Sequence, residues 1–441
     1  MRVIIIFLMS LSFLVVSCDD DSSNSNNSTN TINNVYNNTT LNNTTNNSDC
    51  GNFTLEEGEL CDGFDTGEVT CESLGFRGGE LVCGFDCQSY NTDSCVPGFT
   101  TIAAGENHTC GTTSTEEVMC WGSNMDEELA TTSDISESKE PIVATNLIYD
   151  LYDVKSGGVR NCGSASSNSI VCWGDDEIPF EITSPDESAI VSWDVGAAHA
   201  CMATASGVWC WGNNADGQLG NDSTMDSDTP VEVQSITEVT EIVVGGYFTC
   251  AVSTSGNYCW GHGSNGEMGN GTVNDSRTPV LVDTSESGKL TNLAAGDSHV
   301  CGINASSEVY CWGSNSSGQT GTGDSVDHST PAFVEFDGAL IESLSADKDT
   351  SCAVDTTGFG WCWGYNYFDQ MGVGELHGTT EVNSPVGVAM PDSVLFTAIT
   401  VGGYHVCGIS ENNGAWCWGN NDFGQLGIGT TSAAYEPREV Q

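Results

Sequence analysis

Apolar and polar positions alternate in short runs through residues 99–441, and the pattern recurs about every fifty residues. Each copy has an apolar stretch that leads to Gly, or to Asp347 in the sixth copy, then a strand, a polar turn and a second strand ending in Cys-Trp-Gly. A polar loop and a closing proline complete the unit. The seven motifs begin at Cys120, Cys172, Cys210, Cys259, Cys311, Cys362 and Cys417. Strand pairs repeated in this way predict the blades of a β-propeller.

Every copy has a second cysteine nine or ten residues before the motif cysteine. These cysteines are Cys110, Cys162, Cys201, Cys250, Cys301, Cys352 and Cys407. The two members of a pair flank a hairpin turn, where opposite residues lie close enough for a disulfide. We therefore expect one local disulfide in each blade. Buried free thiols are the alternative, which export would disfavour.

The clearest copies run Trp-Gly-Asn to Gly-Gln-Leu-Gly, at 211–220 and 418–427. This plan resembles the regulator of chromosome condensation (RCC) repeat across essentially all of 99–441. The resemblance implies an all-β fold, a seven-bladed β-propeller. Because the chain stops soon after the last closing proline, Pro437, we expect the strand at Thr100–Ala104 to lie beside the last repeat and seal the ring.

Residues 1–17 have the pattern of an export signal, in which Arg2 precedes the apolar run Val3–Val16. The run ends at Ser17-Cys18 and resembles a bacterial lipoprotein signal, which predicts lipidation of Cys18. An ordinary secretory signal cut nearby is the alternative. Residues 18–49 are rich in Asn, Ser and Thr and are expected to form a disordered tether, because they cannot bury enough apolar surface to fold.

Residues 50–95 hold six cysteines and predict a small module in which disulfides replace a core. The run Gly58–Gly63, followed by Ser73–Phe76, is similar to cysteine-rich modules of secreted proteins from predatory and social bacteria. The sequence does not fix the pairing of these cysteines. Zinc binding by Cys83 and Cys87 is a weaker alternative, since their spacing is loose and the module lacks His.

The chain carries 61 acidic and 9 basic residues, a formal charge of −52. This charge disfavours nucleic acid and anionic lipid as partners, because both need clustered Lys and Arg. Exchange activity on nuclear GTPases, known for the founder of the family, is not expected of an exported chain. We find no serine-hydrolase, zinc-protease or phosphate-loop motif, and expect no catalytic residue, cofactor or metal.

Four repeats place a histidine two residues before the first cysteine, at His108, His199, His299 and His405. A ring of metal ligands is conceivable at this repeated position. The histidines occupy alternate blades, however, and metal ligation needs nitrogens about 2 Å from one ion. A structural role is therefore the better interpretation.

Function is expected where blades depart from the common plan. In blade two, Pro179 follows Trp173 by only six positions and the Gly-Gln-Leu-Gly loop is absent, which predicts a notch. Blade six enlarges this loop and places exposed aromatic residues in it: Tyr365, Tyr367 and Phe368. A second candidate patch precedes the first cysteine of blades four and seven: Tyr247, Phe248 and Tyr404. Packing against local apolar surface is the alternative for these residues.

These observations predict a monomeric, lipid-anchored, non-enzymatic scaffold of the bacterial cell envelope. Its partner is expected to be an extracellular protein or glycan. A propeller hydrolase, or an inhibitor of a secreted enzyme, is the alternative.

Overall fold

The computed structural model describes residues 55 and 59–441, except 93, 133, 176, 375, 376, 392 and 393, and omits the side chains of 177–178. The predicted export signal, Cys18 and the tether lie outside the described residues. Among the described residues, no helix has the length and apolar character needed to cross a membrane.

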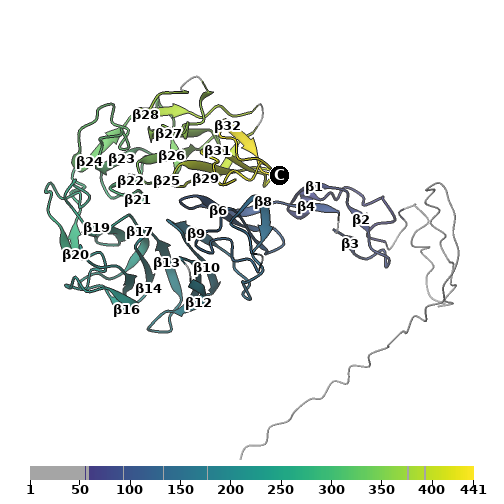
Figure 1. Cartoon of the computed structure of the whole chain (residues 1–441), viewed down its shortest axis with the longest axis horizontal. Helices are drawn as coiled ribbons and strands as arrows, with labels where there is room; N and C mark the ends of the chain where they lie inside the picture. Colours follow the sequence, from purple (N-terminus) through teal and green to yellow (C-terminus); the bar gives the residue numbers. More distant parts are fainter. Residues whose placement is uncertain are drawn as a thin grey trace, which may run out of the picture. The chain divides into compact units, whose positions relative to one another are not determined.

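Seven four-stranded antiparallel sheets form the repeat region, and each sheet uses four consecutive strands. Blades one to seven comprise β5–β8, β9–β12, β13–β16, β17–β20, β21–β24, β25–β28 and β29–β32. Figure 1 shows the blades arranged around a centre, with the first strand of each blade innermost. The prediction of an all-β, seven-bladed propeller is therefore confirmed.

The innermost strands carry the apolar stretch of each repeat. They are β5 (Phe99–Ala104), β9 (Val154–Gly157), β13 (Ile190–Val195), β17 (Val239–Val244), β21 (Thr291–Ala295), β25 (Ile341–Asp347) and β29 (Phe396–Val401). The second strands begin at the histidine position. They are β6 (His108–Thr113), β10 (Arg160–Ser166), β14 (His199–Thr204), β18 (Phe248–Ser253), β22 (His299–Ile303), β26 (Thr350–Asp355) and β30 (His405–Ser410).

The third strands end in Cys-Trp-Gly or one residue later. They are β7 (Val118–Ser123), β11 (Ser169–Gly174), β15 (Val208–Gly212), β19 (Gly256–Gly261), β23 (Val309–Gly313), β27 (Gly360–Tyr365) and β31 (Ala415–Gly419). The outer strands contain the closing prolines. They are β8 (Glu137–Val143), β12 (Glu177–Thr183), β16 (Ser227–Glu232), β20 (Ser276–Leu281), β24 (His328–Val334), β28 (Glu381–Gly387) and β32 (Ala434–Glu439).

A disulfide joins the second and third strands of every blade. The two cysteines of each pair stand directly opposite in the strand register, as Cys110 and Cys120 do. Their Cα atoms lie 4.0–4.1 Å apart in all seven blades. Each bond closes a short loop and can stabilise the fold by at most about 2–3 kcal/mol, because the hairpin is already favoured in the unfolded chain.

The repeat tryptophans pack between neighbouring blades, and six of them donate an indole hydrogen bond to the preceding blade. The acceptor is always a backbone carbonyl in the loop between the third and outer strands. The pairs are Trp121–Gln425, Trp173–Glu128, Trp260–Gln218, Trp312–Glu267, Trp363–Gln319 and Trp418–Gln370, at 2.7–3.0 Å. Their role is structural.

The four repeat histidines are buried and bridge adjacent blades. Each Nε2 bonds a polar side chain of the next blade at 2.7–2.8 Å: His108 to Asn161, His199 to Thr249, His299 to Ser351 and His405 to Thr109. Each polar partner in turn donates to the same loop carbonyl that accepts the tryptophan. Burial lowers the pKa of His199, His299 and His405 to about 3, so at neutral pH they are uncharged links between blades.

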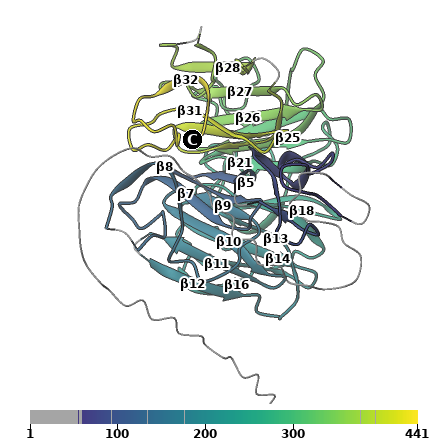
Figure 2. The same ribbon diagram turned by 90° about the vertical axis from the view of Figure 1, so that its right-hand side faces the viewer.

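The first and last blades adjoin, as both views show (Figures 1 and 2). Strand β5 packs against β29 and β30, which confirms its expected place beside the last repeat. Its ladder partner is nevertheless β6, so no strand is shared between the first and last sheets. Backbone bonds seal the junction, including Gly403 N to Gly105 O (3.0 Å) and Phe99 N to Asn413 O (2.8 Å).

The segment before the propeller has little regular structure. It contains the 3-10 turn η1 (Glu72–Leu74) and the short strands β1 (Phe76–Gly79), β2 (Val82–Cys83), β3 (Tyr90–Asn91) and β4 (Cys95–Pro97). Disulfides join Cys61 to Cys83 and Cys71 to Cys95, and Cys87 is also disulfide-bonded. Neither Cys83 nor Cys87 is therefore a thiolate that could bind zinc.

Candidate functional site

The innermost strands enclose a central cavity of about 390 Å³. At one end, the loops between the first and second strands of each blade surround the opening, which we call the channel mouth (residues 105–107, 157–159, 196–198, 245–247, 296–298, 347–349 and 402–404). Glycine is required where a side chain of the same blade packs on the backbone. A Cβ at Gly296, for example, would clash with the ring of His299.

Blade six departs from this rule and brings charge into the mouth. It has Thr350 at the histidine position, and the smaller side chain leaves room for Asp347 where other blades have Gly. The next residue, Lys348, reaches blade one and pairs with Glu106 at 2.8 Å. Its Nζ also lies 5.4 Å from the ring centroid of Tyr404 in blade seven.

Four carboxylates interact with this single lysine: those of Glu106, Asp297, Asp347 and Asp349. Burial in the narrow channel, and then the charge of Asp297, raise the pKa of Asp347 to about 7. Burial likewise raises the pKa of Asp297, although Lys348 opposes the shift. The mouth therefore holds more negative charge than Lys348 can balance.

An aromatic cluster borders these charges. Tyr365, Tyr367 and Phe368 of blade six gather with Tyr404 of blade seven. The ring centroids of Phe368 and Tyr404 are 5.0 Å apart, and those of Tyr365 and Tyr367 are stacked at 6.4 Å. Tyr367 is 62% exposed. Tyr404, which the sequence places in a separate patch, thus joins the blade-six aromatic residues across one blade interface.

The other two predicted aromatic residues do not join this cluster. Tyr247 is exposed, at the mouth end of blade four, but no ring contact links it to the cluster within the described part of the chain. Phe248 is fully buried, so the prediction that it binds a partner is wrong. It occupies the inter-blade histidine position and packs in one core cluster with Val300 and Trp312 of blade five.

A buried amide donor without a partner belongs to the same blade-six loop. In blades three and seven, the loop glutamine donates to Asn213 or Asn420, and in blade five to Asp349. The matching positions for Gln370 hold Tyr365 and Tyr404, which offer it no bond. Its Oε1 is fixed by Phe368 N (2.9 Å), as in the other blades, so its Nε2 is directed toward the aromatic cluster.

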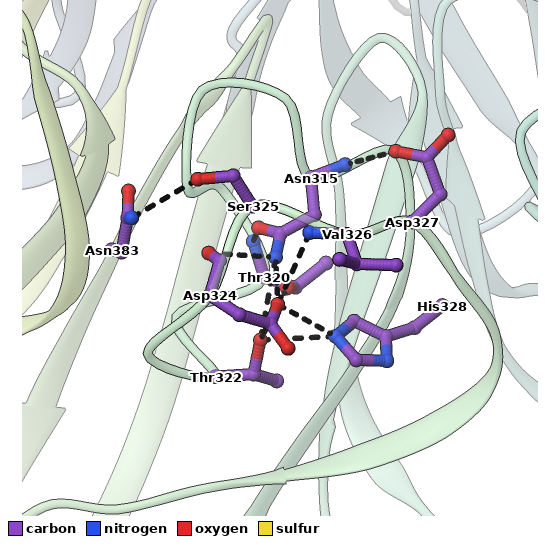
Figure 3. Close-up of polar contacts among 9 residues, drawn as sticks. All are labelled: Asn315, Thr320, Thr322, Asp324, Ser325, Val326, Asp327, His328 and Asn383. Atoms are coloured by element: carbon purple, nitrogen blue, oxygen red, sulfur yellow. Dashed lines mark hydrogen bonds and ion pairs between the residues drawn. The ribbon is translucent and has the colours of Figure 1, made fainter.

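The corresponding loop of blade five shows how such loops are normally closed (Figure 3). Asn315 accepts a bond from Thr320 N and donates to Asp324, and Asp327 holds Asn315 N. His328 joins the network through one nitrogen, Nε2, which contacts both Thr322 and Asp324. A catalytic triad needs its hydroxyl and carboxylate on different ring nitrogens, so this cluster is a loop clasp.

The loop of blade four comes closer to a triad. His262 Nε2 lies 2.9 Å from Ser264 Oγ, and its Nδ1 lies 3.1 Å from Glu267 Oε1. The His262–Glu267 pair stands where Asn213 and Gln218 make the loop-closing bond in blade three. The His262–Glu267 pair therefore closes the loop of blade four, as Asn213 and Gln218 close that of blade three.

The backbone N–H groups of the residues next to Ser264 are not free to bind an oxyanion. The N–H groups of Gly263, Asn265 and Gly266 are all engaged within the loop or by Asp275. Acyl transfer needs free donors aimed at the developing oxyanion. These three N–H groups therefore do not supply them.

Two further carboxylates on the innermost strands, those of Asp194 and Glu241, have a different task. Asp194 Oδ2 accepts Val244 N at 2.8 Å, and Glu241 accepts Leu293 N and Asn292 N at 2.6 and 2.9 Å. These N–H groups lie on the free edge of the innermost strand of the next blade. The carboxylates therefore satisfy exposed strand edges, and no ligand is needed to explain them.

Comparison with known proteins now decides the family. The RCC1-like domain matches residues 175–441, and the regulator of chromosome condensation (RCC1) repeat matches residues 99–125. The chain belongs to the RCC1-like domain family. The resemblance found in the repeats is thus confirmed.

Relatives of this RCC1-like protein are diverse. The ultraviolet-B receptor UVR8 of Arabidopsis thaliana is 28% identical over 360 residues, which span 77% of this chain and 81% of the receptor. The mouse E3 ubiquitin-protein ligase HERC2 is 27% identical over 74% of this chain, but that match spans only 7% of the ligase. Yeast RCC1 (Prp20), solved bound to Kap60, superposes with a TM-score of 0.64 at 17% identity, covering 74% of this chain and 83% of that one. This structural likeness establishes the fold alone.

Proposed function

We propose that this protein is a non-enzymatic binding scaffold, exported and lipid-anchored through Cys18 at the bacterial cell envelope. It binds a protein through the channel mouth at blades six and seven. The observation that carries the proposal is the aromatic cluster of Tyr365, Tyr367, Phe368 and Tyr404 beside an excess of carboxylates. Aromatic anchors next to complementary charge are typical of protein interfaces.

The partner surface is basic, with a Lys or Arg side chain entering the mouth. Lys348 makes a contact of this kind within the chain, because its Nζ lies over the Tyr404 ring and pairs with Glu106. The yeast relative bound to Kap60 supports protein binding as a use of this fold.

The test compares two exposed tyrosines on the soluble chain without its lipid anchor. Tyr367→Ala removes the exposed member of the cluster, while Tyr152→Ala removes a tyrosine of similar exposure (58%) before β9, at the opposite end of the channel. We expect Tyr367→Ala to lose at least tenfold in capture of a basic envelope protein, and Tyr152→Ala to be unchanged. Raising salt from about 0.1 to 0.5 M should weaken capture as well. Equal capture by both variants would remove the mouth from the proposal.

The anchor is tested separately. Cys18→Ala is expected to move the protein from the membrane fraction to the soluble fraction, with the propeller still folded by circular dichroism. Membrane association that survives this substitution contradicts lipidation at Cys18.

A hydrolase is the second candidate, favoured only by the Ser264–His262–Glu267 arrangement. Ester and peptide substrates should give no sustained turnover above that of Ser264→Ala. Turnover that disappears in Ser264→Ala would overturn the scaffold proposal in favour of an enzyme.

A further inference from the structure

Blade two lacks the loop that every other blade wraps toward its neighbour. Only residues 175–176 connect β11 to β12, whereas residues 213–226 connect β15 to β16 in blade three. In the six complete loops, a backbone carbonyl receives the next tryptophan and the following residue is fully buried. Blade two supplies neither group to blade three.

Trp211 of blade three therefore has no acceptor. It is the one repeat tryptophan whose Nε1 makes no hydrogen bond in the described part of the chain. Its side chain is nearly as buried as the other six, at 4% exposure. Its Nε1 is not fully buried, so water reaches this N–H group, and an acceptor from a partner would take the place of that water.

A second donor faces the same gap. Arg160 takes the position from which a histidine of other blades reaches the next blade, as His108 reaches Asn161. One of its nitrogens, Nη2, pairs with Asp175, but its Nε is buried without a partner. The residue of blade three at the position that bonds the histidine in other blades is Ala200, which has no polar side chain.

The four histidine interfaces show that these groups converge. At the junction of blades one and two, His108, Asn161, the Glu128 carbonyl and Trp173 form one continuous chain of hydrogen bonds. Between blades two and three, both ends of this chain are donors, Arg160 and Trp211, and the carbonyl between them is missing. Trp211 Nε1 and Arg160 Nε therefore have no acceptor among the described residues.

We propose that this gap is a docking site for a polypeptide loop of a partner protein, one of whose backbone carbonyl oxygens accepts a hydrogen bond from Trp211 Nε1, beside Arg160. Six loops of this chain already provide such a carbonyl, at 2.7–3.0 Å from the tryptophan. A neutral carbonyl fits better than a carboxylate, because Asp175 already pairs with Arg160 and the chain carries a charge of −52. The site is separate from the channel mouth.

The probe is a synthetic peptide with the sequence of residues 213–222, the loop of blade three. It is titrated into the ¹⁵N-labelled chain while the indole N–H signals are followed by NMR, with the Trp211 signal assigned through Trp211→Phe. We expect a saturable downfield shift of Trp211 while Trp260 stays in place. Arg160→Gln is expected to weaken binding at least fivefold.

A loop-restored variant is the matched control, in which residues 213–226 replace 175–176. Its Trp211 signal should lie downfield without peptide and should not respond to peptide. The proposal is overturned if Trp211 does not move at millimolar peptide, if acetate alone moves it equally, or if the loop-restored variant still responds.

Discussion

The interface between blades three and four and the one between blades two and three derive from the same repeat but are held differently. The first contains His199, Thr249 and the Gln218 carbonyl in a closed chain of hydrogen bonds. The second contains Arg160 and Ala200, and no loop carbonyl. The first interface has its donors satisfied, although His199 Nδ1 is buried there without a partner, whereas the second leaves two donors open.

The contrast extends around the ring. Blades two, four and six lack the histidine, and the polar residue of the next blade disappears with it, replaced by Ala200, Val300 or Val406. These three blades also carry the notch, the exposed Tyr247 and the aromatic cluster. Loss of the hydrogen-bonded chain therefore coincides with the surface features that distinguish the blades from one another.

Acid should affect the closed interfaces most. The folded pKa of His199, His299 and His405 is about 3, below the ordinary value of 6.5. The unfolded chain then binds more protons, so stability is full above pH 6.5 and falls as pH drops toward 3. Each histidine costs up to about 1.4 kcal/mol per pH unit in this window.

Urea unfolding from pH 7.5 to 4.5 measures the effect, with His199→Gln as the comparison. The channel carboxyls with raised pKa, such as Asp347, act in the opposite direction and lower the total slope. The difference between variant and wild type isolates the histidine. Identical pH slopes would contradict a buried, neutral His199.

The apolar interface between blades four and five can be converted toward the polar kind. Phe248→His buries an imidazole without a partner and should cost about 2–4 kcal/mol. Adding Val300→Thr restores the hydroxyl found at the closed interfaces, with the Glu267 carbonyl already in place. We expect about 1–2 kcal/mol to return, measured as the coupling energy of a double-mutant cycle. Strict additivity would show that the two positions are independent.

Asp347 distinguishes the mouth loop of blade six from the mouth loops of the other blades, which have Gly at this position. Its folded pKa is about 7 against 3.8 for an unperturbed Asp, so its contribution to stability is present at low pH and lost as pH rises through 7. Asp347→Asn should therefore stabilise the protein at pH 8 but not at pH 4. Because the channel leaves this carboxyl partly accessible, we expect a gain of only about 1–2 kcal/mol. Equal stability of both proteins at pH 8 would contradict the raised pKa.

The ring and the opposed cysteine pairs were within reach of the sequence, because a period near fifty and a repeated Cys-Trp-Gly leave few architectures. The contact of Tyr404 with the blade-six loop could not be predicted from the sequence, since it depends on how neighbouring blades pack against each other. Phe248 was misassigned because an aromatic residue at a strand start looks the same whether it faces solvent or the next blade. The usable signal was Val300 of blade five, the residue that packs against Phe248, which is apolar as are Ala200 and Val406 after the other two blades without the histidine.

The smallest predicted effect tests the comparison most directly. Trp260→Phe removes an indole donor and leaves the Gln218 carbonyl with one bond fewer, whereas Trp211→Phe removes a donor that has no partner. Both substitutions lose similar volume from similarly buried sites. Trp260→Phe should therefore destabilise the protein by about 1 kcal/mol more than Trp211→Phe, as measured by urea unfolding at pH 7.5. In the loop-restored chain this difference should vanish, because Trp211 then has its own carbonyl to lose. A difference that persists there would mean that packing, and not the missing loop, sets Trp211 apart.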